Sequence, residues 1–330
     1  MRLVVVLSLL TFFSCQRPIN FVLPPSSKTI TLWDATWSPD GQYVAIGGNI
    51  DTVRILSTKS FEVVKKYPVR ETITKLRWHP SKPLLAVATQ VPGDGLVLIN
   101  LETDKLKYIP GILPSGGRGL GWNISGEILA FGDYEGDVSF FDTEGQLLRK
   151  VPTGLKAVID LSWHPFRNEV LTVSEHISHY DYENDTFLPE INDRKEEVLM
   201  LCVAWHPSGD FFVTGDYGDF IENYPPLLQF WDAKGNNLRK FAGGTAEYRN
   251  LRWNPDGTML ASTSEALRLW SPQGDLLQEQ PSSQLLWGVD WSPDGKKLII
   301  SGDDGILVFW NEKLKRITGA NDDLGSKKVK

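Results

Sequence analysis

Short apolar segments recur along this chain, and turn-forming residues separate them. A segment of alternating apolar and polar residues leads into a tryptophan, as in the stretch 73–78, and a Pro, Asp or Gly turn follows it. A second and a third apolar segment come next, such as 84–88 and 138–141, and a more polar fourth segment, such as 147–151, closes the unit. Short segments with turn signals every 8–12 residues or so predict antiparallel strands. No long stretch has the period of a helix.

The tryptophan that ends the first segment of each unit marks an internal repeat. Its sequence is clearest in Trp37-Ser38-Pro39-Asp40-Gly41 and in the stretch 291–295, and successive tryptophans are 41, 44, 41, 42, 48 and 38 residues apart. Four strands in a repeat of about 40 residues are typical of one blade of a β-propeller. The seven copies therefore predict an all-β fold, a seven-bladed β-propeller of four-stranded antiparallel blades over residues 28–318.

The residues just before each tryptophan indicate where the first strand lies. Two positions earlier the residue is always apolar, which is typical of a buried face: Ala35, Leu76, Leu120, Leu161, Val203, Leu251 and Val289. Three positions earlier the residues are polar or small: Asp34, Lys75, Gly119, Asp160, Cys202, Asn250 and Gly288. Because neighbouring residues of a strand point to opposite faces, the second set is expected to lie near the central channel.

The repeat resembles the WD-repeat β-propellers from about Lys28 to Ile317. The dipeptide that names this family stands at Trp231-Asp232, and looser forms are Trp310-Asn311 and Phe141-Asp142. The Gly-His pair that precedes the first strand in the family is missing, so packing is expected to hold the blades more than the family's hydrogen-bond network does. The Trp-Ser-Pro-Asp-Gly turn also occurs in six-bladed periplasmic propellers of the Tol system, but seven tryptophans favour seven blades.

The two ends of the chain lie outside the predicted propeller. Residues 1–15 have Arg2, an apolar run and then Cys15, which resembles a bacterial lipoprotein signal with Cys15 as the lipidated residue. A simple signal peptide is the alternative. Residues 16–27 are rich in proline and predict a tether, and 319–330 predict a disordered tail. We expect an envelope protein, anchored to the membrane only by its lipid and facing the periplasm. The alternative is a secreted soluble protein.

Few residues suggest chemistry. His79, His164 and His206 occupy the turn position that Ser38 and Ser292 hold in other repeats, so they are expected to be turn residues rather than metal ligands. His176 and His179 are three apart on a predicted strand and therefore point to opposite faces. Acidic residues between second and third strands are expected to cap turns: Asp51, Asp94, Asp133, Asp137, Asp216, Asp219, Asp303 and Asp304. Cys202 is expected to be a buried apolar residue. No cofactor and no catalytic group are predicted.

Two features suggest a binding surface. The residue four before each motif tryptophan should lie at the channel entrance, and it is Trp33, Thr74, Arg118, Ile159, Leu201, Arg249 or Trp287. Ring closure should bring Trp33 next to Trp287, with Arg249 beside them. Simple packing between blades is the alternative role. The second feature is the long loop 216–226, with Tyr217, Phe220 and Tyr224, and Tyr134 has the place in repeat three that Tyr217 has in repeat five.

The resemblance to WD-repeat propellers implies a binding role. We therefore expect a monomeric, non-enzymatic scaffold that binds a protein or peptide at the strand-entrance face, with Trp33, Trp287, Arg249, Arg118, Tyr134, Tyr217, Phe220 and Tyr224 as candidate contacts. The net charge of −7 gives no basic surface for nucleic acid. An envelope enzyme or a small-ligand binder that uses the channel mouth is the alternative.

Overall fold

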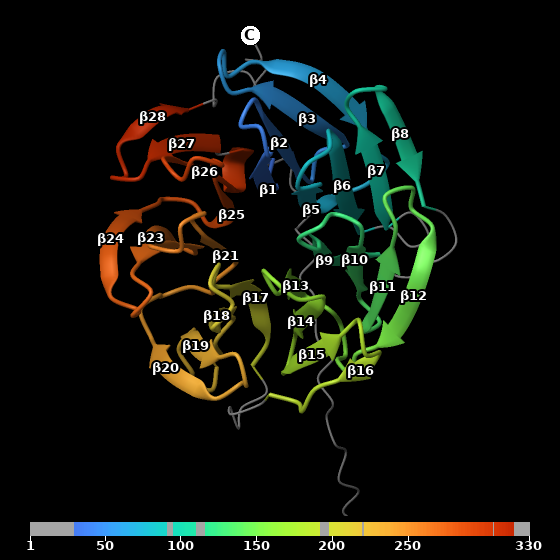
Figure 1. The fold of residues 1–330 in the computed structure, drawn as a ribbon. Helices are drawn as coiled ribbons and strands as arrows, with labels where there is room; N and C mark the ends of the chain where they lie inside the picture. Colours follow the sequence, from blue (N-terminus) through green and yellow to red (C-terminus); the bar gives the residue numbers. More distant parts are fainter. Residues whose placement is uncertain are drawn as a thin grey trace, which may run out of the picture.

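The described residues form a ring of blades around a central channel. The computed structural model describes residues 30–90, 95–109, 116–191, 198–219, 221–305 and 307–319. Within these ranges the strands form seven four-stranded antiparallel sheets, which follow one another around the axis in chain order (Figure 1). The prediction of a seven-bladed β-propeller is confirmed.

Each blade is built from four consecutive strands, and the first strand of each lies beside the channel. Blades 1 and 2 are β1 (Leu32–Trp37), β2 (Tyr43–Gly48), β3 (Thr52–Ser57), β4 (Val63–Pro68), and β5 (Ile73–Trp78), β6 (Leu84–Thr89), β7 (Leu96–Asn100), β8 (Lys105–Tyr108). Blades 3 and 4 are β9 (Gly117–Trp122), β10 (Leu129–Asp133), β11 (Asp137–Phe141), β12 (Leu147–Pro152), and β13 (Asp160–Trp163), β14 (Glu169–Val173), β15 (Ile177–Asp181), β16 (Thr186–Phe187).

The remaining three blades follow the same plan. Blades 5 and 6 are β17 (Met200–Trp205), β18 (Phe211–Asp216), β19 (Leu228–Asp232), β20 (Asn237–Phe241), and β21 (Asn250–Trp253), β22 (Leu260–Thr263), β23 (Ala266–Trp270), β24 (Leu276–Pro281). Blade 7 is β25 (Leu286–Trp291), β26 (Lys297–Gly302), β27 (Leu307–Asn311) and β28 (Arg316–Gly319), with the short 3₁₀ turn η1 (Asp303–Gly305) after β26.

The motif tryptophans are buried between neighbouring blades, as their position in the repeat predicts. Each ends an inner strand, and four of them also bridge to the preceding blade through the indole N–H. Trp163 Nε1, for example, donates to the carbonyl oxygen of Gly121 at 2.9 Å, and Trp78 Nε1 donates to that of Thr36 at 3.2 Å. The tryptophans therefore fix both the core of each blade and its contact with the next.

The turn after each tryptophan is held by the side chain of the next residue. The Ser38 hydroxyl accepts from the Tyr43 backbone N–H at 2.9 Å and donates to Asp40 at 2.6 Å. His164 holds the same position in blade 4, where its Nδ1 accepts from two turn N–H groups and its Nε2 lies 3.2 Å from the carbonyl oxygen of Gly209 in the next blade. These contacts confirm that the turn histidines are structural.

The ring closes by packing of the last blade on the first. Strand β1 contacts β25 and β26. At this junction the Asp290 carboxylate accepts from the Thr36 hydroxyl and from the Trp37 backbone N–H, both at 2.8 Å. Among the described residues, the first blade consists of the first four strands of the chain, and the last blade consists of the last four.

Part of the WD-type hydrogen-bond network is present without the Gly-His pair. The Trp231 indole N–H donates to Thr214 at 2.9 Å, and the Trp270 indole N–H donates to Ser262 at the same distance. Both bonds join the third strand of a blade to its second strand. In blades 5 and 6, these two hydrogen bonds therefore add to the packing that stabilises the blade.

Candidate functional site at the channel mouth

The residues four positions before the motif tryptophans meet where the inner strands begin, as predicted. The rings of Trp33 and Trp287 are stacked, with centroids 5.0 Å apart and planes 17° from parallel. The Arg249 guanidinium carbon lies 3.6 Å from the centroid of the Trp287 ring. Ring closure thus brings two tryptophans and an arginine from three different blades into one stack at the channel mouth.

Acidic side chains hold this stack in place. The indole N–H of Trp287 donates to Asp303 at 2.9 Å, and the same oxygen accepts from the Thr31 hydroxyl at 2.9 Å. Arg249 forms an ion pair with Glu247. Asp303 is one of the acidic residues expected to cap a turn, but its carboxylate accepts from Thr31 and Trp287 instead. Sequence reasoning did not connect Glu247 or Asp303 with the candidate site. Glu247 is only two residues before Arg249, whereas the bond from Thr31 to Asp303 depends on how blades 1 and 7 meet.

The two tryptophans differ in what they offer a partner. Trp33 is 7% exposed, while Trp287 is only half-buried. Trp33 therefore serves mainly as packing beneath Trp287, in line with the alternative role that the sequence left open. Trp287 is the more accessible part of the stack, whereas the Arg249 side chain that lies on it is 13% exposed.

The loop of blade 5 stands beside this stack. Tyr217 is 45% exposed, and Asp219 and Tyr224 exchange two backbone hydrogen bonds of 2.7 Å that close the loop. Ile221, at the loop tip, is the most exposed large apolar side chain among the described residues. Phe220 lies outside the described residues. Sequence reasoning missed Ile221, although an isoleucine in a long polar loop is a signal that was available.

Arg118 and Tyr134 contribute the opposite side of the mouth. Arg118 belongs to β9, and Tyr134, just after β10, packs against the buried side chains of Ile159 and Leu201. Burial raises the pKa of the Tyr134 hydroxyl, and the positive charge of Arg118 opposes that rise. The described candidate residues thus come from blades 1, 3, 5, 6 and 7, around one opening.

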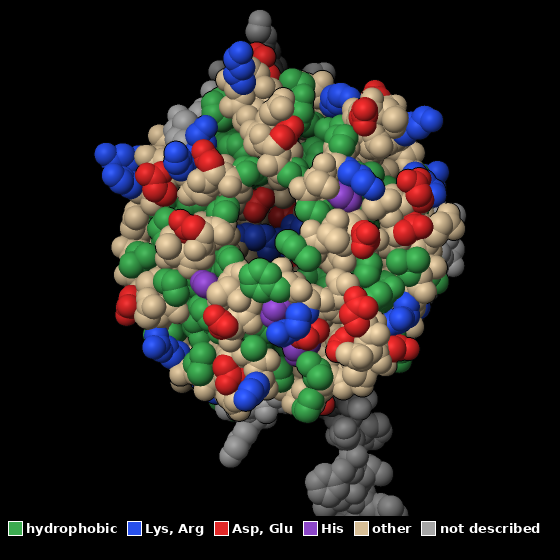
Figure 2. Space-filling view, viewed as in Figure 1, with side chains coloured by type: hydrophobic (Ala, Val, Ile, Leu, Met, Phe, Trp, Pro, Cys, Tyr) green, Lys and Arg blue, Asp and Glu red, His purple; other side chains and the backbone are tan. Residues whose placement is uncertain are grey.

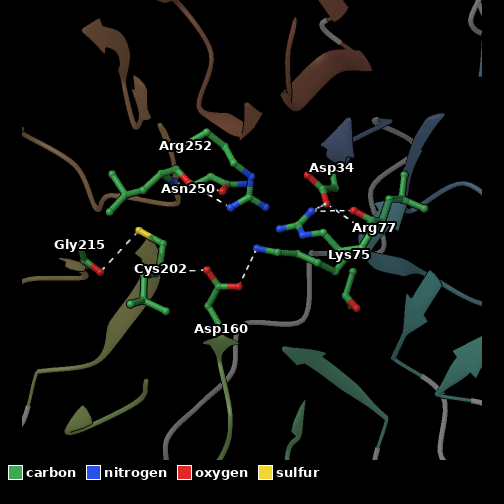
Figure 3. A network of polar contacts seen from close by, with 12 residues as sticks. Asp34, Lys75, Arg77, Asp160, Cys202, Gly215, Asn250 and Arg252 are labelled. Atoms are coloured by element: carbon green, nitrogen blue, oxygen red, sulfur yellow. Dashed lines mark hydrogen bonds and ion pairs between the residues drawn. The ribbon is translucent and has the colours of Figure 1, made fainter. Parts of the chain in front are cut away.

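Below the mouth, ion pairs between blades line the channel. The ammonium group of Lys75 in blade 2 lies 3.0 Å from Asp160 in blade 4, and Asp34 in blade 1 lies 2.9 Å from Arg77 in blade 2 (Figure 3). In a view along the axis, basic and acidic side chains are visible inside a central hollow (Figure 2). The residues three before each tryptophan therefore do line the channel, but the pairing of Lys75 with Asp160 could not be seen in the sequence.

Two of these carboxylates also accept hydrogen bonds from backbone N–H groups of neighbouring inner strands. Asp34 accepts from the Leu76 backbone N–H at 2.9 Å, and Asp160 accepts from the Val203 backbone N–H at 3.2 Å. In both cases the acceptor belongs to the preceding blade. Inner strands would otherwise leave these N–H groups unpaired, which is costly when they are buried.

The other chemical candidates are structural. His179 lies 3.1 Å from Glu169, whereas His176 faces Glu190, so the two histidines do not converge. No group of three or more metal-ligating side chains occurs among the described residues. Burial raises the pKa of the Cys202 thiol, as expected of an inert apolar residue.

Of the acidic turn residues, Asp133, Asp216 and Asp219 cap turns as predicted, whereas Asp137 forms an ion pair with Lys150. Asp133 accepts from the backbone N–H groups of Glu135 and Asp137, and Asp216 accepts from those of Gly218 and Leu227. Asp94 lies outside the described residues. In the same part of the chain, no helix has the length and apolar character that crossing a membrane would need.

Sequence comparisons agree with the fold. Residues 16–81 match the family model of the anaphase-promoting complex subunit 4 WD40 domain, and residues 195–221 and 271–311 match that of the WD domain, G-beta repeat. The fold defines the class, a seven-bladed β-propeller, and these matches show that parts of the chain are similar to WD repeats.

Several curated proteins are similar to parts of the chain. Protein transport protein sec13 of Aspergillus fumigatus is 24% identical over 236 residues, which are 58% of this chain and 74% of that protein. The transcriptional corepressor LEUNIG_HOMOLOG of Arabidopsis thaliana is 26% identical over 194 residues, 56% of this chain and 23% of that protein. The periodic tryptophan protein 2 homolog of Schizosaccharomyces pombe is 28% identical over 119 residues, 34% of this chain but 13% of that protein.

Proposed function

We propose that this propeller is a non-enzymatic scaffold that binds a protein or peptide at its channel mouth. The observation that carries the proposal is the stack of Arg249 on Trp287, held by Glu247 and Asp303 beside the exposed Tyr217. Trp, Tyr and Arg are the residue types that dominate binding energy at protein interfaces. The roles printed for two relatives, protein transport and transcriptional corepression, are in keeping with recognition rather than catalysis.

The rigidity of the mouth favours this role. Arg249 and Trp287 are positioned by neighbours from different blades, so little conformational entropy is lost when a partner docks on them. Binding by such a surface needs no chemical step. The function proposed is equilibrium recognition by a preformed rim.

A cross-linking pull-down with matched variants tests the proposal. Tyr217→Ala and Trp287→Ala should each weaken capture of the bound protein by about 10- to 30-fold, as loss of an interface hot spot does. Phe166→Ala is the matched control, because Phe166 is 69% exposed but lies in the turn that follows the tryptophan of blade 4, at the opposite end of its inner strand. Trp33 is unsuitable because it is buried.

The outcome that contradicts the proposal is equally clear. If all three variants melt as the wild type does and capture the same protein with the same affinity, the channel mouth is not the binding surface. Turnover of a small molecule by the purified chain would favour an enzyme instead. Loss of capture in Phe166→Ala alone would show that the partner binds the opposite face, which is formed by the turns after the motif tryptophans.

We further propose that the propeller is attached to the cell envelope through a lipid on Cys15. Cys15 lies outside the described residues, so this proposal rests on its place after the apolar run of residues 3–13. Several acyl chains anchor a protein stably where one chain is marginal. Cys15→Ala should therefore move the protein from the membrane fraction to the periplasmic fraction, and protease added to spheroplasts should digest the wild type. A Cys15→Ala protein that stays with the membrane would refute lipid anchoring.

A further inference from the structure

Two arginines face each other across the channel mouth. Arg118 lies on β9 of blade 3, and Arg249 immediately precedes β21 of blade 6; these two inner strands stand on opposite sides of the channel (Figure 1). The Nε atoms of both arginines are buried, and neither has a hydrogen-bond partner among the described residues. Two buried donors therefore belong to one opening and lack acceptors.

The cations around the channel differ in whether a carboxylate is in direct contact with them. Arg249 has its own counter-ion in Glu247, and Lys75, deeper in the channel, has Asp160. Arg118 has neither a hydrogen bond nor an ion pair with any side chain in the part of the chain that the structure describes. Arg118 is thus a partly buried cation with no carboxylate in direct contact, and such a charge is costly unless it is paired.

The influence of Arg118 reaches the other cations of the channel. Burial lowers the pKa of Arg249; the charge of Glu247 opposes this shift, and the positive charge of Arg118 adds to it. Burial likewise lowers the pKa of Lys75, and Arg118 adds to that shift while Asp160 opposes it. Arg118 therefore stands within electrostatic range of both cations.

We propose that Arg118, together with Arg249, binds a carboxylate from an acidic segment of a protein partner at the channel mouth. This inference rests on the proposed function and specifies the chemistry of the partner. A guanidinium group presents a planar pair of N–H donors that matches a carboxylate, and such charge-assisted bonds are among the strongest in proteins. Trp287 and Tyr217 border the same opening and supply apolar contacts beside the acidic residue.

A peptide array tests the chemistry directly. Each acidic peptide is printed beside a copy in which every Asp is replaced by Asn and every Glu by Gln, and the purified full chain is applied. The pair with the strongest signal is then measured in solution by fluorescence anisotropy. The wild type should bind the acidic member at least tenfold more tightly, and added salt should reduce that preference.

Variants of Arg118 show whether this residue carries the preference. Arg118→Gln should weaken binding of the acidic peptide by about 10- to 100-fold and leave the amide peptide almost unchanged, since a bond to a charged group is lost. Arg118→Lys should retain part of the preference. Lys59→Gln removes the same charge from an exposed position on blade 1 and is the matched control.

Each other result overturns the inference. Equal binding of acidic and amide peptides by the wild type, or an equal loss for both in Arg118→Gln, shows that Arg118 does not recognise a carboxylate. If inorganic phosphate raises the melting temperature of the wild type but not of Arg118→Gln, and no acidic peptide binds, the pocket takes a free anion instead. Partner capture that depends on Trp287 but not on Arg118 refutes this inference alone, whereas capture independent of Trp287 refutes the proposed function.

Discussion

The ion pair between Lys75 and Asp160 offers a sharp test of how the channel is stabilised. Its two side chains are 2% and 1% exposed, and 3.0 Å separates the ammonium nitrogen from the carboxylate oxygen. Blade 3 lies between their blades, and its inner strand has Gly119 and Gly121 at the positions that line the channel elsewhere, so neither position adds a side chain. Lys75 can therefore reach past one blade to its partner.

Lys75→Met keeps the length of the side chain but removes its charge. The Asp160 carboxylate then stays buried with the Val203 N–H as its remaining hydrogen-bond donor. Breaking a buried ion pair in this way costs about 3–5 kcal/mol of unfolding free energy. Urea unfolding followed by tryptophan fluorescence measures the loss, because the motif tryptophans are buried in the folded ring and exposed in the unfolded chain.

The double variant Lys75→Met with Asp160→Asn separates charge from packing. Asparagine keeps an oxygen for the Val203 N–H and carries no charge, so the double variant should regain most of the stability that Lys75→Met loses. A loss below about 1 kcal/mol in the single variant, or a double variant less stable than the single one, would refute the reasoning, because a pair that matters must show coupling of this size and sign.

Three further predictions concern the blades. Trp163→Ala should lower the unfolding free energy by about 3–5 kcal/mol because it empties a buried site, and an unchanged melting temperature would contradict the core assignment. Gly132→Ala should cost about 1–3 kcal/mol, since a Cβ there would overlap the side chain of Val158; Gly154→Ala, with open space but a φ of +82°, is the comparison and should show only the cost of a left-handed backbone. Burial raises the pKa of Asp290 to about 6, above the unfolded value of about 3.9, so the folded protein holds this proton more tightly. Asp290 should therefore make the unfolding free energy fall as pH rises from about 4 to 6. This part of the pH dependence should disappear in Asp290→Asn, and an identical profile of unfolding free energy against pH in both proteins would contradict the prediction.

Much of the fold could be predicted from the chain alone. The spacing of the tryptophans predicts the number of blades, and the identity of the residue after each tryptophan predicts that His79, His164 and His206 support turns. These features are local: a strand, its turn and the return strand are set by residues within one repeat. The neighbouring positions of Trp33 and Trp287 also follow, because a closed ring must join repeat seven to repeat one.

The exposure and the contacts of each candidate residue depend on the tertiary structure. Both Trp33 and Trp287 stand four residues before a motif tryptophan, yet one is buried beneath the other, because blade packing and not repeat position decides exposure. The bond from Thr31 to Asp303 depends in the same way on the ring, because it joins the first blade to the last.

The sequence by itself therefore determined the repeat, the strands, the turns and the order of the blades, since each of these arises from contacts between residues close in the chain. Only the tertiary structure decided which charges meet across the channel. Lys75 pairs with Asp160, and Arg118 faces Arg249 without a carboxylate of its own, because the ring brings together strands that are far apart in the sequence. Contacts of that kind follow from the geometry of the closed ring and have no signature within a single repeat.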